Sequence, residues 1–123
     1  MLISIITITL NAEKTILKTI RSINNQSFKN FEYIIIDGAS TDQTINIIKK
    51  NLKKKYKIIV EKDNGIYDAM NKGIKISKGE FVGFLNSDDW LNKNTLKKIE
   101  KFIKINNPNI IFGNARFFKK NKF

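Results

Sequence analysis

Two adjacent carboxylates, Asp88 and Asp89, follow a short apolar segment at residues 81–85. That segment has the aromatic and β-branched composition of a buried strand. Carboxylates at the end of such a strand stand where open α/β sheets bind their ligands. Because like charges repel each other, a bound cation or hydroxyl donors would explain the pair best. The alternative is a helix cap, although one Asp would serve that purpose.

Other polar residues lie at the carboxyl ends of the remaining predicted strands, namely Thr9, Asn11, Asp37 and Asp63. Parallel strands end at one edge of their sheet, so these side chains should gather there. Such an edge suits a polar ligand that donates hydrogen bonds from hydroxyl and ring N–H groups. The glycine-rich phosphate motifs of dehydrogenases and P-loop enzymes are absent. A phosphate held through a metal on carboxylates is the remaining route.

The composition restricts the chemistry further. The chain has no Cys and no His, so thiolate sites, His bases and His metal ligands are excluded within it. A metal would need oxygen ligands, which favours Mg, Mn or Ca over Zn. The net charge of +12 has two interpretations. The many Lys residues cover solvated helix faces, or they attract nucleotides, phospholipid headgroups or nucleic acid. Because the functional edge is acidic, we expect no nucleic-acid partner.

Apolar periodicity and turn residues predict the elements that position these groups. Strands are expected at residues 2–10, 31–36, 57–60, 81–85, 110–112 and 114–118, and helices at 12–23, 66–77 and 94–105. A further helix after the second strand should carry Ile45, Ile48 and Leu52 inward. Asn11 should cap the first helix, and Ser40 with Gln43 should form a capping box before the second. Ile66, Ala69, Met70, Gly73, Ile74 and Ser77 should form the inner face of the third helix. The alternation predicts an α/β fold with a mostly parallel sheet and helices on both faces.

At 123 residues the chain forms one domain at most. It has neither an apolar run long enough to span a bilayer nor a secretory signal, so a cytoplasmic location is expected.

Four segments resemble the family 2 glycosyltransferases. They are ITITLN at 6–11, IIIDGASTD at 34–42, DNGIYDAMNKG at 63–73 and FLNSDD at 84–89. The resemblance implies an inverting, nucleotide-sugar-dependent enzyme with the Rossmann-like GT-A fold. In that family the catalytic base belongs to an acceptor-binding half that follows the nucleotide half. Residues 1–123 are therefore expected to be the donor-binding part of one GT-A domain, truncated before that half, with the base beyond Phe123.

The resemblance also implies the site. Thr9 and Asn11 would contact the nucleoside, Asp37 the base, and Asp88 the ribose and diphosphate side. Asp89 would bind a divalent cation, Mn or Mg, that bridges the diphosphate. The full nucleotide-binding set implied is Thr9, Asn11, Asp37, Asp63, Gly65, Asp68, Asn71, Asn86, Ser87 and Asp88.

Three positions depart from the family pattern. Met70 stands where many members have Arg, Gly38 stands where many have a second acidic residue, and Ser87 replaces the first Asp of the metal motif.

The expected function is sugar transfer from a nucleotide-sugar, UDP-sugar favoured, to an acceptor hydroxyl in surface polysaccharide or glycolipid synthesis. The expected partners are this donor and a saccharide or lipid-linked acceptor. With its basic surface, the protein should associate peripherally with the inner face of a membrane. The alternative is a nucleotide-diphosphate-binding protein without transferase activity.

Overall fold

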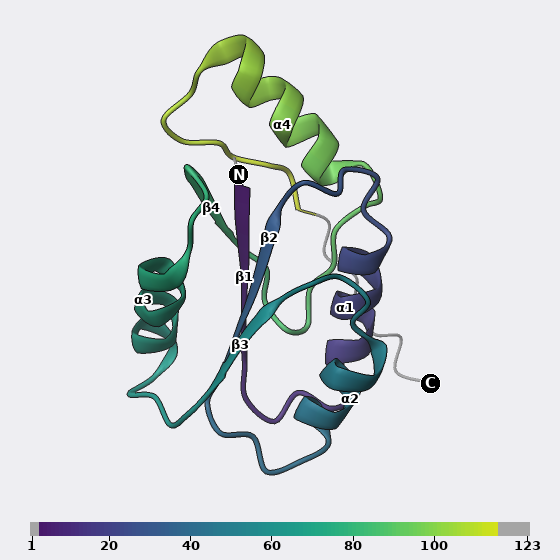
Figure 1. Ribbon diagram of the computed structural model, residues 1–123, viewed down its shortest axis with the longest axis vertical. Coiled ribbons are helices and arrows are strands. Elements are labelled where there is room, and N and C mark those ends of the chain that lie inside the picture. Colours follow the sequence, from purple (N-terminus) through teal and green to yellow (C-terminus); the bar gives the residue numbers. More distant parts are fainter. Residues whose placement is uncertain (1–2, 116–123) are drawn as a thin grey trace.

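The computed structural model describes residues 3–115, which form a four-stranded parallel sheet (Figure 1). The strands lie in the order β3-β2-β1-β4. Their bounds are β1 Ile3–Thr9, β2 Glu32–Asp37, β3 Lys57–Val60 and β4 Phe81–Phe84. Every neighbouring pair is parallel, so all four strands end at one edge of the sheet, here called the carboxyl edge. The predicted parallel sheet is confirmed.

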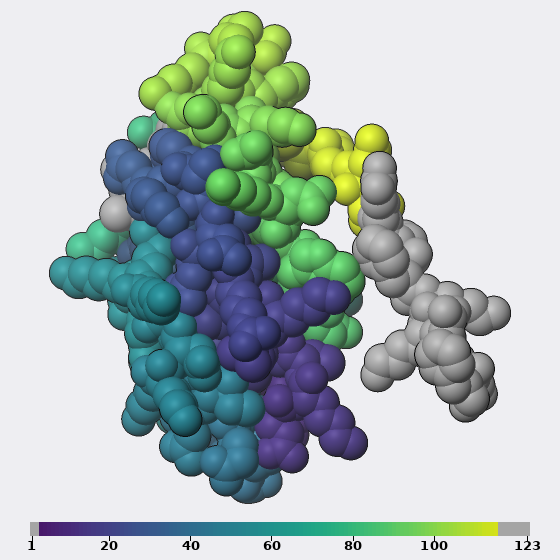
Figure 2. Space-filling view, turned by 90° about the vertical axis from the view of Figure 1, so that its right-hand side faces the viewer, coloured from purple at the N-terminus to yellow at the C-terminus, as the bar shows by residue number. Residues whose placement is uncertain are grey.

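The described residues form four helices, and helices lie on both faces of the sheet, as predicted. Their bounds are α1 Ile16–Asn24, α2 Thr44–Asn51, α3 Ile66–Ile76 and α4 Thr95–Asn106. Helix α3 lies on one face and α1 and α2 lie on the other, while α4 lies near the end where the strands begin (Figure 1). With α1 and α2 facing the viewer, α4 forms the top of the molecule (Figure 2). None of these helices is long and apolar enough to cross a membrane.

The Ile residues of the central strands β1 and β2 point to both faces of the sheet, and helices cover both faces. Ile3 and Ile5 of β1 pack with α1 and α2, whereas Ile6 packs with Ala69 of α3. In β2 every residue is buried. Nearly continuous β-branched sequence is typical of strands that are buried on both faces of a parallel sheet.

The predicted caps of the first two helices were wrong. Helix α1 begins at Ile16, and Asn11 does not cap it: Asn11 has a φ of 48° and accepts a hydrogen bond from the N–H of Thr41. Helix α2 begins at Thr44 without a side-chain cap, because Ser40 bonds to Asp37 instead of forming the capping box. Asn11 thus bonds across the carboxyl edge, whereas Ser40 bonds back to the end of its own strand.

The predicted fifth strand is also wrong. Residues 110–112 form no strand, and Phe112 is 90% exposed, because no neighbouring strand pairs with this segment in residues 3–115. Of the predicted sixth strand, 114 and 115 are not in a strand and 116–118 lie outside the described residues.

The inner face of α3 is narrower than predicted. Ala69 and Gly73 are buried, whereas Ile66 and Ile74 are exposed. A side chain at Gly73 would start 2.7 Å from Cγ2 of Ile6, so its absence allows the helix to approach the sheet closely.

Candidate functional site

Thr9 and Asp37 lie side by side at the carboxyl edge, where they are register partners at the ends of β1 and β2. Both side chains are buried. The N–H of Gly38 donates to the carbonyl of Thr9 at 2.9 Å, so the chain leaving β2 stays against β1.

The carboxylate of Asp37 organises the loop that follows β2. One oxygen accepts from the N–H of Ser40 at 2.7 Å and the other from its hydroxyl at 2.6 Å. The Ser40 hydroxyl in turn accepts from the N–H of Asn11 at 2.8 Å. Thr41 donates from its N–H to the side-chain oxygen of Asn11 at 2.8 Å. Three predicted site residues, Thr9, Asn11 and Asp37, are thus brought together.

The hydroxyl of Thr9 is buried and has no hydrogen-bond partner. Buried polar groups in folded proteins nearly always have one, so an exception needs an explanation. A ligand lying over the ends of β1 and β2 would supply the missing partner.

The loop after β3 adds a second carboxylate to this group. A Cβ atom at Gly38 would lie 2.9 Å from Oδ2 of Asp63, so the Asp63 carboxylate lies over Gly38. Its other oxygen accepts from the N–H of Gly65 at 3.0 Å. Glycine at position 38 therefore makes room for an acid that the loop after β3 supplies.

Asp68 connects the same loop to α3. Its carboxylate accepts from the N–H of Asn64 at 3.0 Å and from Lys72 at 3.2 Å. These two donors hold the pKa of the Asp68 carboxyl below its usual range. Lys72 also forms an ion pair with Glu61 at 3.1 Å. Asn71, by contrast, lies exposed one turn along α3.

Asn86, Ser87, Asp88 and Asp89 form a separate group in the turn that follows β4. The N–H of Asp89 donates to the carbonyl of Asn86 at 3.1 Å, and the Asn86 amide donates to the Asp89 carboxylate at 3.3 Å. The alternative that the pair caps the next helix is wrong, because α4 begins only at Thr95, after Asn94. Both acids are exposed at the carboxyl edge.

The donor set of this turn fits a hard divalent cation. Residues 3–115 contain no group of three or more acidic, His or Cys side chains that could hold a metal alone. Mg²⁺ commonly binds through one or two carboxylates, completed by waters and substrate phosphates. Asp88 and Asp89 meet that description when a diphosphate completes the site.

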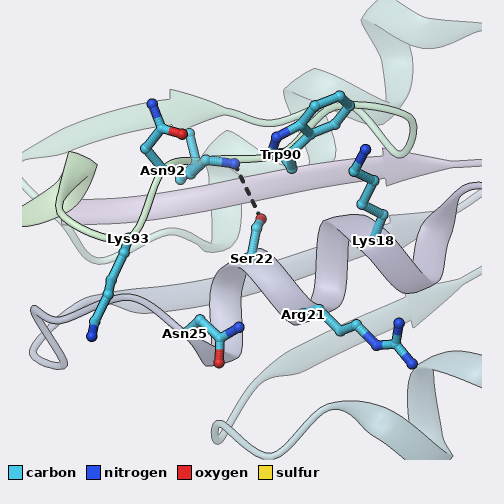
Figure 3. Close-up of a pocket in the computed structure, with 8 residues that line it drawn as sticks. Lys18, Arg21, Ser22, Asn25, Trp90, Asn92 and Lys93 are labelled. Atoms are coloured by element: carbon cyan, nitrogen blue, oxygen red, sulfur yellow. Dashed lines mark hydrogen bonds between the residues drawn. The ribbon is translucent and has the colours of Figure 1, made fainter.

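Helix α1 bonds directly to the segment that follows the two acids, a contact that the sequence did not predict. The hydroxyl of Thr19 donates to the carbonyl of Asp89 at 2.7 Å. The N–H of Leu91 donates to the hydroxyl of Ser22 at 3.2 Å, the dashed line in Figure 3. The available signal was the presence of polar residues on the buried side of an apolar helix.

A cavity of about 470 Å³ lies beside these contacts. Lys18 stands over the ring of Trp90, with its ammonium 3.4 Å from the ring centre (Figure 3). The residues that line the cavity are Lys18, Arg21, Ser22, Asn25, Trp90, Leu91, Asn92 and Lys93. Arg21 and Lys93 point away from each other, so they do not converge on one ligand atom.

A sequence model described as "Glycosyl transferase family 2" matches residues 4–123. Escherichia coli WfaP, a UDP-Glc:alpha-D-GlcNAc-diphosphoundecaprenol beta-1,3-glucosyltransferase, is 44% identical over 92 residues, which cover 72% of this chain. The chain spans less than half the length of the curated relatives it matches, 46% and 36% in two of them.

Two solved structures resemble the chain in fold and in sequence. Staphylococcus aureus TarS in complex with UDP-GlcNAc has a TM-score of 0.78 and 37% identity, covering 87% of this chain and 32% of that one. The glucosyl-3-phosphoglycerate synthase of Mycobacterium tuberculosis, in complex with Mn²⁺, UDP and glucosyl-3-phosphoglycerate, has a TM-score of 0.59 and 26% identity. The match to this synthase covers 70% of this chain and 33% of the synthase.

Proposed function

Because the chain belongs to glycosyl transferase family 2 and has its Rossmann-like GT-A fold, we propose that it is the donor-binding part of a sugar transferase. The donor is a UDP-sugar, and the acceptor is a hydroxyl of a cell-surface glycan or a lipid-linked saccharide. The observation that carries the proposal is the carboxyl edge, where Asp37 ends β2, Asp63 follows β3 and the Asp88–Asp89 turn follows β4. The UDP-GlcNAc complex of TarS and the lipid-linked acceptor in the name of WfaP support these substrate classes.

The residues have distinct roles in this proposal. Thr9 and Asn11 contact the nucleoside, and the buried Thr9 hydroxyl gains its missing partner from it. Asp37 recognises the uracil ring, since an acceptor fixed by Ser40 can read a ring N–H group. The outer side of the nucleotide pocket is lined by Asp63, Gly65, Asp68 and Asn71. The ribose and diphosphate are faced by Asn86, Ser87 and Asp88.

Asp89 holds the divalent cation, Mn²⁺ or Mg²⁺. When bound, such a cation offsets the negative charge that develops on the leaving diphosphate. The Mn²⁺ and UDP bound in the mycobacterial synthase support this assignment.

Transfer then requires groups from both parts of the longer enzyme. The acceptor hydroxyl attacks the anomeric carbon from the side opposite the diphosphate, which inverts the configuration. A carboxylate base takes the hydroxyl proton, and we expect it beyond Phe123. The 123-residue chain should therefore bind the donor without transferring its sugar.

Calorimetry with UDP, GDP and TDP, each with and without Mn²⁺, tests the proposal. We expect UDP to bind most tightly and Mn²⁺ to strengthen its binding. Asp89→Asn should lose most of the Mn²⁺-dependent affinity while its melting temperature stays the same or rises slightly, because repulsion with Asp88 is relieved. Glu100→Gln on α4 is the matched control. Equal, metal-independent binding of all three nucleotides would refute the proposal. Sugar transfer by this chain would refute the expectation that the base lies beyond Phe123.

A further inference from the structure

Helix α1 carries two buried polar side chains, Thr19 and Ser22, where an amphipathic helix normally carries apolar ones, and a third, Gln26, lies two residues after its end. Their residues are 0%, 9% and 1% exposed. Thr19 and Ser22 are three residues apart and share one side of the helix. Gln26 extends this polar stripe beyond the helix end, and its side-chain amide donates to the carbonyl of Ser22 at 3.1 Å. Buried polar groups destabilise a fold unless they are hydrogen-bonded, so this stripe needs partners.

The partners are backbone groups of the segment that follows Asp88. Thr19 donates to the carbonyl of Asp89 at 2.7 Å, and Ser22 accepts from the N–H of Leu91 at 3.2 Å. The side-chain amide of Gln26 donates to the carbonyl of Asn92 at 2.8 Å. An irregular connection between β4 and α4 is thereby fixed to a helix that packs on the central strands.

Asp89 is fixed on both sides of its Cα atom. Its N–H donates to the carbonyl of Asn86, and its carbonyl accepts from Thr19. The carboxylate itself is exposed, and the amide of Asn86 contacts it at the long distance of 3.3 Å. The position of that carboxylate therefore depends mainly on the backbone of Asp89. The bond from Thr19 holds the carbonyl side of that backbone.

We propose that Thr19 is a positioning residue for metal binding by Asp89. From α1, the Thr19 hydroxyl holds the backbone of the metal ligand Asp89 in place. Thr19 itself would touch neither the cation nor the nucleotide. The inference rests on the metal role of Asp89 proposed above. Residues that hydrogen-bond to metal ligands without touching the metal typically contribute about 10- to 100-fold to metal affinity or activity.

Thr19→Val tests this inference, since valine keeps the size and β-branching of threonine but removes the donor. Thr19→Ser restores the donor. Thr7→Val is the matched control: Thr7 is also fully buried, and its hydroxyl hydrogen-bonds only to Tyr33 at 2.8 Å among the contacts described, within the sheet. For each variant, UDP affinity is measured by calorimetry with and without Mn²⁺, together with the melting temperature.

We expect Thr19→Val to lower UDP affinity in Mn²⁺ by about 10-fold, with little change in metal-free affinity. Thr7→Val should lower the melting temperature to a similar extent but keep the wild-type response to Mn²⁺, and Thr19→Ser should recover most of that response. If Thr19→Val keeps the full Mn²⁺ response of the wild type, Thr19 is only structural and the inference is wrong. A wild type without any Mn²⁺ response would instead refute the metal role of Asp89, and this inference with it.

Discussion

Gly38 leaves the space that the Asp63 carboxylate occupies at the carboxyl edge. A Cβ atom there would lie 2.9 Å from Oδ2 of Asp63 and 3.4 Å from Leu10. The closest atom is the end of a side chain that can move, so the fold can tolerate a methyl group while the carboxylate cannot keep its position.

We therefore expect Gly38→Ala to weaken UDP binding without a large loss of stability. The loss should be about fivefold, equivalent to roughly 1 kcal/mol for one displaced hydrogen-bonding group. Gly113→Ala is the control, because a Cβ atom at Gly113 meets nothing within 4 Å. Calorimetry and thermal unfolding separate the two effects. Unchanged UDP affinity in Gly38→Ala would show that Asp63 is not part of the nucleotide site.

Glu32 forms a polar cluster at the opposite end of the strands. It accepts hydrogen bonds from Ser4 and from Lys57, both at 2.6 Å, and from the N–H of Lys78 at 2.8 Å. Burial alone would raise the pKa of the Glu32 carboxyl, but these donors outweigh it and lower the pKa.

A lowered pKa makes Glu32 a source of acid sensitivity. Its contribution to stability is fully present above its usual pKa of about 4.5 and is lost as pH falls toward the lower folded value. We expect Glu32→Gln to destabilise the fold at pH 7 by about 1 to 3 kcal/mol. In urea unfolding from pH 7 to 3, the difference from wild type should shrink below about pH 4.5. The exposed Glu80→Gln is the control, and a difference constant with pH would contradict this account.

At the scale of elements, α3 depends on close contact with β1. A Cβ atom at Gly73 would lie 2.7 Å and 3.0 Å from two carbon atoms of Ile6, which is fully buried. Alanine would favour the helix itself by about 1 kcal/mol. Overpacking of a core costs typically about 1 to 3 kcal/mol, and the fixed Ile6 places this site at the upper end.

Gly73→Ala should therefore lower the urea midpoint of unfolding. Lys75→Ala, on the exposed side of the same helix, gains helix propensity without the clash and should leave the midpoint unchanged or raise it. A higher midpoint in Gly73→Ala would mean that α3 moves away from the sheet at no cost.

The elements were more predictable than the contacts between them. Apolar periodicity was sufficient to predict the four strands and the four helices, because burial on a parallel sheet leaves that signal in the sequence. The polar residues at the strand ends then predicted the acidic carboxyl edge. Ser40 and Asn11 were assigned to local caps, since nothing local reveals that they bond across the edge. The contact of Thr19 with Asp89 joins residues seventy positions apart. Residues 110–112 have strand-like composition but no neighbouring strand in the described chain.

At the scale of the molecule, the net charge of +12 predicts attraction to anionic surfaces. We expect the protein to co-sediment with vesicles rich in anionic lipid at low salt, with roughly 1 kcal/mol from each Lys or Arg near the surface. Neutral vesicles are the control, and raised salt should release the protein. Equal binding to neutral and anionic vesicles, or none at low salt, would argue against work at a membrane surface.

The strand order also governs how the chain can fold. The central strand β1 is made first, yet Ser4 pairs with both Glu32 and the much later Val82. Pairings between distant residues slow folding, because a long loop must close before the contact stabilises anything. During synthesis, β1 therefore has an open, Ile-rich edge until β4 has left the ribosome. Nascent chains that stall before Val82 would present that edge to one another, so aggregation of incomplete chains is the expected cost of this strand order.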